Sequence, residues 1–317
     1  MKIAVTGAAG FIGSHVAEKL SQIGHEVIGI DGMTSYYARS LKEANAEDVQ
    51  MSGVRFLEMD LLDDRLGDEL ADVEIIYHLA AQPGISATTP FEDYVRNNLM
   101  TTHHLLEICA KLSKFACFVN IATSSVYGRM ATEAEDAMPK PTSYYGVTKT
   151  AAEQLVMAYH QDKGLPATSL RLYSVIGPRE RPEKLYSKLI RCILEERPFP
   201  LFEGSRKHSR SFTYVGDIVN GLVSVLPRLD EVNGEIFNIG SDIEHTTGEG
   251  IEMIEDILGM SAQFEILPKR AGDQHRTLAN IEKAGRLLGY EPQTTLYDAL
   301  KDQVDWYKSR IHNKVTF

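Results

Sequence analysis

The sequence predicts an α/β fold: a Rossmann doubly wound parallel sheet with a smaller C-terminal α/β substrate lobe. Apolar segments rich in β-branched residues alternate with amphipathic segments through the first half of the chain, which is the pattern of successive βαβ units. The first apolar segment runs directly into a glycine-rich turn. A length of 317 residues is enough to bury one large core or two closely packed ones.

Three evenly spaced glycines follow the first expected strand, and a helix is expected to begin at about Phe11. Gly7 permits a tight turn, Gly10 lets the backbone approach a pyrophosphate, and Gly13 lets the helix pack closely on the strand. The first residues of that helix, Phe11 and Ile12 among them, direct free N–H groups toward an anion. The spacing therefore predicts a dinucleotide site at the first turn.

A carboxylate, Asp31, ends the second expected strand. It lies about 20 residues past the glycines, where a dinucleotide site holds the adenosine ribose. A carboxylate accepts hydrogen bonds from the ribose diol and repels a 2′-phosphate. The segment between Gly32 and Ala38 contains no Arg or Lys that could receive such a phosphate. We therefore predict NAD as the cofactor in preference to NADP.

The remaining elements of the first half continue the same alternation. Ligands of parallel sheets bind outside the carboxyl ends of the strands, so the residues at these ends are expected to share one crevice. The expected strands are residues 2–6, 26–30, 54–59, 74–80, 116–122 and 167–172, and the expected helices include 11–23, 91–112 and 144–163. The strand-end residues are Asp31, Asp60, Ala80 to Gln82 and Thr123.

After Arg171 the chain becomes rich in Pro, Gly and Arg, which indicates loops around a more irregular lobe. We predict an NAD-binding Rossmann domain at residues 1–173 and a substrate lobe at residues 174–317, with part of the lobe returning to the sheet. Helices are expected near residues 183–196, 216–228, 247–258, 280–288 and 296–312.

Composition excludes several classes of partner. The formal net charge of −11 argues against binding to nucleic acid or to an anionic membrane surface, although a local basic pocket can still bind a phosphorylated small molecule. The apolar runs are too short to cross a bilayer, and the N-terminus enters the first strand without room for a signal peptide. Three cysteines without a CxxC motif indicate a reducing compartment, and scattered histidines indicate no metal site. We expect a cytoplasmic protein.

Three side chains form a candidate catalytic group. Thr123 ends an expected strand, while Tyr145 and Lys149 are four residues apart and share one face of an expected helix. The pKa of an unperturbed tyrosine phenol is about 10, which is too high for a base at neutral pH. A neighbouring ammonium and a positive nicotinamide ring both favour the phenolate, so the pair is suited to general base catalysis. Thr123 can orient the substrate hydroxyl, and Lys149 can also hold the nicotinamide ribose.

With these motifs assembled, the chain resembles the extended short-chain dehydrogenase/reductases, within the NAD-dependent sugar-nucleotide epimerase/dehydratase family. It is most similar to the bacterial UDP-glucuronate 4-epimerases. The resemblance spans nearly the whole chain. The motifs that carry it, in chain order, are TGAAGFIGSH, MDLLD, HLAAQPG, RNNLMTT, ATSSVYG, YYGVTK, VIGPRERP, RSFTYV and FNIGS.

The resemblance implies a catalytic triad of Thr123, Tyr145 and Lys149. It implies that Arg210 and Arg276 bind the nucleotide diphosphate, with Arg181 as a third candidate, which suits the bidentate geometry of arginine. Family members are often dimers, which implies a homodimer through residues 91–112 and 144–163. Further cofactor contacts are implied for Asp60, Leu61, Leu79, Ala80, Ala81 and Asn98, beside Tyr145 and Lys149.

The residues after Thr123 indicate which reaction of the family is favoured. Dehydratases of the family usually carry Asp-Glu directly after the catalytic Thr, and decarboxylases usually keep a Glu two residues after it. Here Ser124 and Ser125 occupy these positions, and a serine hydroxyl is a poor general acid or base near neutral pH. This favours 4-epimerisation of a UDP-sugar, by transient oxidation at C4 and return of the hydride on the opposite face.

The identity of the sugar is left open. Ser124, Ser125 and Ser174, with Thr123, can donate hydrogen bonds to the C5 carboxylate of UDP-glucuronate. UDP-glucose and UDP-N-acetylglucosamine stay possible, as does a dehydratase or decarboxylase. A dehydrogenase that releases NADH and a non-catalytic nucleotide sensor are further alternatives. The departures from the glucuronate pattern are Ser86, Ser174, residues 183–186 and Ser211, of which the first and third are expected to touch the sugar pocket.

Overall fold

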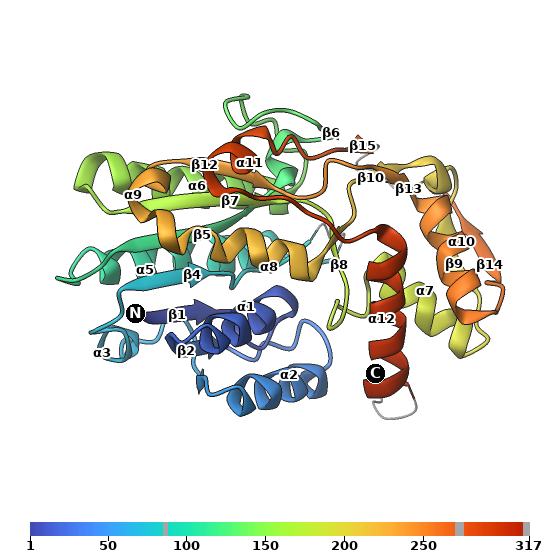
Figure 1. Cartoon of the computed structure of the whole chain (residues 1–317), viewed down its shortest axis with the longest axis horizontal. Coiled ribbons are helices and arrows are strands. Elements are labelled where there is room, and N and C mark those ends of the chain that lie inside the picture. The colour runs from blue at the N-terminus through green and yellow to red at the C-terminus, as the bar shows by residue number, and fades with distance from the viewer. Residues whose placement is uncertain (85–87, 270–275, 313–317) are drawn as a thin grey trace.

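In the computed structural model, which describes residues 1–84, 88–269 and 276–312, seven strands of these segments form a parallel sheet at the centre of the molecule (Figure 1). The strand order is β12-β7-β5-β4-β1-β2-β3, which confirms the predicted Rossmann class. Their bounds are β1 (Lys2–Thr6), β2 (Glu26–Asp31), β3 (Arg55–Glu58), β4 (Ile75–His78), β5 (Cys117–Thr123), β7 (Ala167–Leu172) and β12 (Ile236–Ile239).

Side chains alternate along the strands between two apolar layers, one on each face of the sheet. In β1, Ile3 and Val5 belong to the first layer, whereas Ala4 belongs to the second. Because both faces are covered, the strands read as nearly continuous apolar runs. The first layer contains α1 (Phe11–Gln22), α2 (Arg39–Met51), α8 (Val215–Val223) and α11 (Glu282–Leu288); the second contains α3 (Leu66–Glu69), α5 (Thr101–Cys109) and α6 (Tyr144–Lys163).

Helix α6 has the bounds expected from the sequence, because both of its ends are marked locally. The Ser143 hydroxyl accepts a hydrogen bond from the Gly146 N–H at 3.1 Å and caps the first turn. Gly164 ends the helix in the left-handed conformation with φ of 68°. The cap therefore determines where Tyr145 and Lys149 lie along the helix.

The segment expected as one helix at residues 91–112 is helical as far as Cys109, but its winding changes. It consists of α4 (Phe91–Tyr94), a π-helical segment η1 (Val95–Met100) and α5. A π-helical turn inside an α-helix often occurs at a functional site. Here it contains Asn98, one of the residues that the family resemblance implies at the cofactor.

A second core lies beside the sheet, on the right in Figure 1. It is formed by α7 (Leu185–Leu194), α10 (Thr247–Leu258) and α12 (Leu296–Arg310), with β9 (Phe199–Phe202) paired to β14 (Phe264–Leu267). Strand β12 and helix α8 also come from the later half of the chain, but they join the first core. The domain boundary after residue 173 stays a prediction.

Short elements connect these layers. They are η2 (Ser124–Tyr127), β6 (Met130–Ala131), β8 (Val175–Ile176), η3 (Ser205–Lys207), β10 (Ser209–Arg210), β11 (Thr213–Tyr214), η4 (Leu226–Arg228), α9 (Leu229–Val232), β13 (His245–Thr246) and β15 (Arg276–Thr277). Strands β13, β10, β15 and β6 form one small sheet. In the described segments, each helix is either too short or too polar to traverse a lipid bilayer.

Candidate functional site

The turn after β1 requires glycine for steric reasons. Gly7 has φ of 73°, and a Cβ there would lie 2.9 Å from the Ala80 nitrogen. A Cβ on Gly13 would lie 2.1 Å from the Gly7 carbonyl oxygen, and one on Gly10 would lie 3.0 Å from the same oxygen. The turn is held by a hydrogen bond from the Gly7 N–H to the Ile30 carbonyl at 2.7 Å. Its shape therefore depends on the absence of side chains.

Helix α1 begins directly after this turn and presents its free N–H groups there. Gly10 is its N-cap residue and provides no side-chain cap, and the first turn contains no acidic residue. The N–H groups of the first turn, including those of Phe11, Ile12 and Gly13, have no partner within an α-helix. A helix N-terminus of this kind binds a phosphate through its N–H groups and its dipole. The turn therefore fits a pyrophosphate.

At the end of β2, the Asp31 carboxylate is held by the backbone and faces a lysine that the sequence analysis did not include. It accepts hydrogen bonds from the N–H groups of Met33 at 2.8 Å and Ala9 at 3.2 Å. The Lys42 ammonium of α2 lies 3.7 Å from one of its oxygens and donates to the Thr34 hydroxyl at 3.1 Å. Burial lowers the pKa of Lys42, whereas Asp31 raises it.

Lys42 changes the charge argument at the ribose site. The segment from Gly32 to Ala38 contains no cation, but helix α2 folds back and brings one beside Asp31. The prediction considered only this segment, and Lys42 lies outside it in the sequence but beside Asp31 in space. The amphipathic pattern of residues 39–51, with Lys42 on its buried face, was the signal that could have revealed it.

The side chains expected along the cofactor differ in their contacts. The Asp60 carboxylate accepts hydrogen bonds from Arg96 at 2.8 Å and from the Leu62 N–H at 2.9 Å, whereas Leu61 is buried in the second core layer. The loop after β4 passes beside the glycine turn, since Ala80 approaches Gly7. Partly buried residues of this loop are Leu79, Ala80 and Ala81.

Asn98 contacts protein groups on both sides. Its side-chain oxygen accepts a hydrogen bond from the Gln82 N–H at 2.7 Å, and its amide nitrogen donates to the Thr148 hydroxyl at 3.0 Å. It thereby connects the loop after β4 to helix α6, at the residue before Lys149. Asn98 therefore supports the helix that carries Tyr145 and Lys149.

The three candidate catalytic residues meet where β5 ends against α6. The Thr123 hydroxyl accepts a hydrogen bond from the Ser125 N–H at 3.2 Å and also hydrogen-bonds the phenol of Tyr145. Lys149 is 3% exposed, and its ammonium has no hydrogen-bond or ion-pair partner among the residues that the structure describes. An unpartnered buried ammonium is costly, which suits a polar ligand at this position.

The ionisation of the pair differs from the expectation. Burial raises the pKa of the Tyr145 phenol, although the hydrogen bond with Thr123 lowers it. Burial also lowers the pKa of the Lys149 ammonium to about 8, against the carboxylate of Glu153, which raises it. The protein groups alone therefore leave the phenol protonated at neutral pH, because its loss of hydration outweighs their stabilisation of the phenolate.

Three serine hydroxyl groups lie at the ends of neighbouring strands. Ser124 and Ser125 begin η2 after β5, and Ser174 follows β7, which pairs with β5. None of the three hydroxyl groups has a hydrogen-bond partner within residues 1–84, 88–269 and 276–312. They are therefore available to a ligand.

The three arginines expected at a diphosphate come from separate segments: Arg181 follows β8, Arg210 belongs to β10 and Arg276 belongs to β15. Arg181 acts on the charge state of Tyr145 and forms an ion pair with Glu183 at 2.7 Å. Arg276 is exposed and pairs with Glu244 at 2.7 Å. In the register of β10 and β15, Arg276 lies opposite Ser209, so it projects from the face opposite to that of Arg210. Their role toward a diphosphate stays a prediction.

The departures from the glucuronate pattern also lie in different surroundings. Ser86 lies outside the described residues. Tyr186 is fully buried in the second core, where a Cβ on Gly250 would lie 1.9 Å from its oxygen. Within residues 183–186, Glu183 approaches the site through its ion pair with Arg181, whereas Tyr186 does not, because its ring fills the core. Ser211 is also fully buried.

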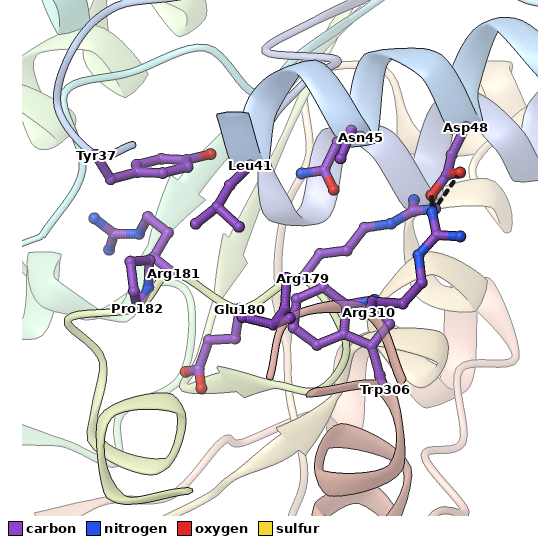
Figure 2. Close-up of a pocket in the computed structure, with 12 residues that line it drawn as sticks. Tyr37, Leu41, Asn45, Asp48, Arg179, Glu180, Arg181, Pro182, Trp306 and Arg310 are labelled. Carbon is purple, nitrogen blue, oxygen red and sulfur yellow. Dashed lines mark hydrogen bonds and ion pairs between the residues drawn. The ribbon is translucent and has the colours of Figure 1, made fainter. Parts of the chain in front are cut away.

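A small pocket lies between α2, the loop after β8 and α12 (Figure 2). Asp48 of α2 accepts hydrogen bonds from Arg310 at 2.7 Å and from Arg179 at 2.9 Å. Tyr37 and Arg181 lie at its other end in the same view. The pocket contains none of the three candidate catalytic residues, and its ion pairs connect the two cores.

Comparisons with known proteins identify the family to which a chain with this fold belongs. A family model described as the NAD dependent epimerase/dehydratase family matches residues 3–240. An uncharacterized UDP-glucose epimerase of Bacillus subtilis (strain 168) is 38% identical over 314 residues, which are 98% of each chain. UDP-glucuronate 4-epimerase 3 of Arabidopsis thaliana is 34% identical over an alignment of 326 residues, which covers 96% of this chain and 76% of that protein.

A solved structure gives the same result. UDP-glucuronic acid 4-epimerase from Bacillus cereus, in complex with UDP-glucuronic acid and NAD, is 39% identical and superposes with a TM-score of 0.93. The alignment covers 98% of this chain and 99% of that chain. The match to the family model includes every strand of the central sheet, β12 among them. The chain therefore belongs to the NAD dependent epimerase/dehydratase family.

Proposed function

We propose that the chain is an NAD-dependent 4-epimerase of a UDP-sugar, with UDP-glucuronate as the favoured substrate and UDP-glucose or UDP-N-acetylglucosamine as the alternatives. One observation carries the proposal. Tyr145 hydrogen-bonds Thr123 beside the buried ammonium of Lys149, and the two residues after Thr123 are serines in place of carboxylates. The similarity to UDP-glucuronic acid 4-epimerase of Bacillus cereus supports it.

The residues present fit NAD. The glycine turn leaves room for a pyrophosphate, the first turn of α1 has free N–H groups, and Asp31 lies at the end of β2. Lys149 would hold the nicotinamide ribose, since its buried ammonium has no partner in the described part of the chain. NAD, when bound, supplies the acceptor of the hydride from C4 of the sugar and a positive ring near Tyr145.

Tyr145 acts as the base that takes the proton of the sugar 4-hydroxyl. Burial alone holds the phenol protonated, so the phenolate requires positive charge beside it. The Lys149 ammonium is placed to provide part of that charge, one helical turn along α6. Thr123 orients the sugar hydroxyl toward the phenol. The proton returns from Tyr145 to the C4 oxygen when the configuration at C4 has been inverted.

Ser124, Ser125 and Ser174 bind the sugar at its C5 substituent. Their hydroxyl groups, at the ends of β5 and β7, have no partners among the described residues. Hydroxyl donors can stabilise a carboxylate without a buried countercharge. The candidates for the diphosphate are Arg181, Arg210 and Arg276. Of these, Arg181 is the one whose charge lowers the pKa of Tyr145.

A dehydratase or a decarboxylase is the second candidate. Either reaction requires a group that exchanges protons at C5 or at a leaving group. The two residues after Thr123 are serines, and the described side chains that shift the pKa of Tyr145, which are Thr123, Arg181 and Tyr94, include no carboxylate. This observation favours epimerisation.

The test is an NMR analysis of the products. Purified protein is incubated with NAD and, separately, with UDP-glucuronate, UDP-glucose and UDP-N-acetylglucosamine. We expect a C4-inverted product from one of them with no net NADH. A pentose product identifies a decarboxylase, a 6-deoxy-4-keto product identifies a dehydratase, and stoichiometric NADH identifies a simple dehydrogenase.

We also propose that the protein is a cytoplasmic homodimer that pairs through residues 91–112, which include α4, η1 and α5, and through α6. Large apolar side chains are exposed on this surface: Phe91, Met100, Tyr144 and Val147. Exposed apolar patches of this kind are typical of protein interfaces. The free cysteines, all buried, suit a reducing compartment. Light scattering coupled to gel filtration tests the dimer, and a Val147→Arg variant is expected to be monomeric.

A further inference from the structure

A buried ion pair lies behind the catalytic face of α6. Glu153 of α6 is 0% exposed and Arg171 of β7 is 1% exposed. The Arg171 guanidinium donates to both carboxylate oxygens, from Nη2 at 2.7 Å and from Nε at 2.9 Å. The Ser169 hydroxyl donates to the same carboxylate at 3.1 Å. Burying two charges costs about as much as their attraction returns, so stability alone does not explain the pair.

The pair is in line with the catalytic residues. Tyr145, Lys149 and Glu153 occupy successive positions four residues apart on α6, so they share one face. Lys149 has no hydrogen bond or ion pair to the described residues, and the charge of Glu153 opposes the effect of burial on its protonation. Glu153 therefore interacts with two cations, through an ion pair with Arg171 and through its charge with Lys149.

Arg171 also reaches the strand end that carries Thr123. Its Nη1 donates to the Tyr127 phenol at 2.7 Å and to the Glu135 carbonyl at 3.0 Å. Tyr127 is the last residue of η2, the turn that directly follows Thr123. The Tyr127 phenol in turn donates to the Asn238 side chain of β12 at 2.8 Å. One guanidinium thus joins α6, which carries Tyr145 and Lys149, to η2, which directly follows Thr123.

We propose that Glu153 and Arg171 are positioning residues of the catalytic site: Glu153 keeps Lys149 protonated, and Arg171 holds Glu153 and η2 in register on β7. The part of this inference that concerns turnover rests on the proposed function. The part that concerns the charge of Lys149 does not, because it is a property of the protein by itself.

Other ionisable groups near Lys149 do not replace Glu153. His78 of β4 interacts with Lys149, but burial lowers its pKa to about 3, so it is neutral. Tyr127 of η2 has a pKa raised by burial and is also neutral. Tyr94 of α4 interacts with Tyr145. The Glu135 carboxylate accepts a hydrogen bond from the Asn238 N–H at 2.8 Å.

The remaining groups on elements packed against α6 are occupied elsewhere. Glu107 of α5 binds Lys163 at 2.7 Å, at the far end of α6, and His103 of α5 contacts the ring of Tyr159 there. Arg96 of η1 is paired with Asp60 at 2.8 Å. Burial raises the pKa of Cys117 in β5 to about 12. Glu153 is therefore the carboxylate whose charge acts on Lys149 in the described structure.

The first experiment is an NMR titration of lysine side chains labelled at Cε, with NAD-free protein. A Lys149→Met variant identifies the Lys149 resonance. We expect its midpoint to fall by at least about one pH unit in Glu153→Gln, because the attraction is removed while the Arg171 charge remains. Glu153→Asp keeps the charge and is expected to stay close to the parent protein. Glu107→Gln, which removes a distant carboxylate, is the control without a shift.

A double variant keeps the test decisive if Glu153→Gln does not fold. Glu153→Gln with Arg171→Met removes both charges and leaves no uncompensated buried guanidinium. Its Lys149 midpoint is expected between those of the parent and of Glu153→Gln. An identical midpoint in all folded variants overturns the proposal.

The second experiment is the pH profile of kcat with NAD and the accepted sugar. The alkaline limb is expected to move to lower pH in the same order as the NMR midpoints, whereas a purely structural role lowers kcat equally at every pH. An unshifted limb in a folded variant contradicts the catalytic part of the inference. If the parent converts no UDP-sugar but the NMR shift is observed, the proposed function fails and the assignment of the pair stands.

Discussion

At the phenol of Tyr145, two local effects oppose each other. Burial raises its pKa, and the hydrogen bond with Thr123 lowers it. Burial acts in the opposite sense on Lys149, whose pKa falls to about 8. The two residues are therefore both shifted toward their neutral forms. Charge at the site depends on groups that favour ionisation: Glu153 for the lysine, and Thr123 and Arg181 for the phenol.

Tyr145→Phe is expected to abolish turnover while it leaves NAD binding nearly unchanged. The variant removes the proton-accepting oxygen and keeps the ring, and loss of a general base typically costs about 10²- to 10⁴-fold in rate. Steady-state kinetics and calorimetric titration with NAD measure the two effects. Activity equal to that of the parent would rule out Tyr145 as the base.

Asp31→Ala is expected to weaken NAD binding by roughly tenfold and to relax discrimination against NADP, because one charged hydrogen-bond acceptor is lost. Lys42 then has no countercharge and becomes able to pair with a 2′-phosphate. Titrations with both cofactors measure the ratio of the two affinities. Asp31→Ala with Lys42→Met is the matched control, in which the gain for NADP is expected to disappear. An unchanged ratio in Asp31→Ala would contradict the role of the carboxylate.

At the scale of elements, local signals predicted some segments and missed others. Helix α6 begins and ends at capping residues that are visible in the sequence, Ser143 and Gly164. Strand β12 carries no such signal, because its position beside β7 depends on a contact 67 residues apart in sequence, such as Ile236 with Ser169. The π-helical winding of η1 was likewise not predictable, since it accompanies the contact of Asn98 with Gln82.

Ser143→Ala is expected to destabilise the protein by about 1 kcal/mol, since it removes the N-cap of α6. It is also expected to lower kcat, because the first turn of α6 carries Tyr145. Thermal unfolding and steady-state kinetics measure the two effects. Thr295→Ala, which removes the corresponding cap of α12, is the matched control: a similar loss of stability is expected there without the loss of kcat. Equal kinetic effects in the two variants would contradict the argument.

At the scale of the whole molecule, two adjacent loop residues, Arg179 and Glu180, connect the helices on the sheet to the second core. Arg179 binds Glu18 of α1 at 2.8 Å. It also binds Asp48 of α2 at 2.9 Å (Figure 2). Glu180, the next residue, accepts a hydrogen bond from Gln303 of α12 at 2.7 Å. Charged groups at this junction are largely buried, so the relative position of the two cores depends on their pairing.

The stability of the junction is expected to depend on pH through Glu180. Burial raises its pKa from 4.5 to about 7, so the native state binds more protons than the unfolded state between these values. The stability contributed below pH 4.5 is lost as the pH rises through 7. Glu180→Gln is expected to be more stable than the parent above pH 7, by on the order of 1–3 kcal/mol.

Denaturant unfolding at several pH values between about 5 and 8 measures the free energy of unfolding of both proteins. The difference between them is expected to reach roughly a few kcal/mol at the upper end of this range. Glu265→Gln, at an exposed position of β14, is the control and is expected to follow the parent at every pH. Parallel curves for the parent and Glu180→Gln would show that Glu180 does not govern the pH dependence.

The candidate site was predictable where chemistry follows spacing along the chain. The glycine turn, the carboxylate at the end of β2 and the Tyr145–Lys149 pair are all short-range patterns, and the structure has them at strand ends and on one helix face. The surroundings of Arg276 and Tyr186 were not predictable. Arg276 forms an ion pair with Glu244, and the Tyr186 ring is buried in the second core, because each side chain contacts residues from distant segments.

The sequence by itself determined the Rossmann class, the glycine turn after β1 and the spacing of Tyr145 and Lys149 on one helix face, because turns, caps and helical periodicity act over a few residues. Only the tertiary structure decided that Lys42 faces Asp31, that Asn98 braces α6 and that Arg171 holds Glu153 behind Lys149. These contacts join residues from separate elements. Their burial and mutual distances exist only once the elements have packed, and a local pattern such as that of residues 39–51 indicates a buried face but not the residue that faces it.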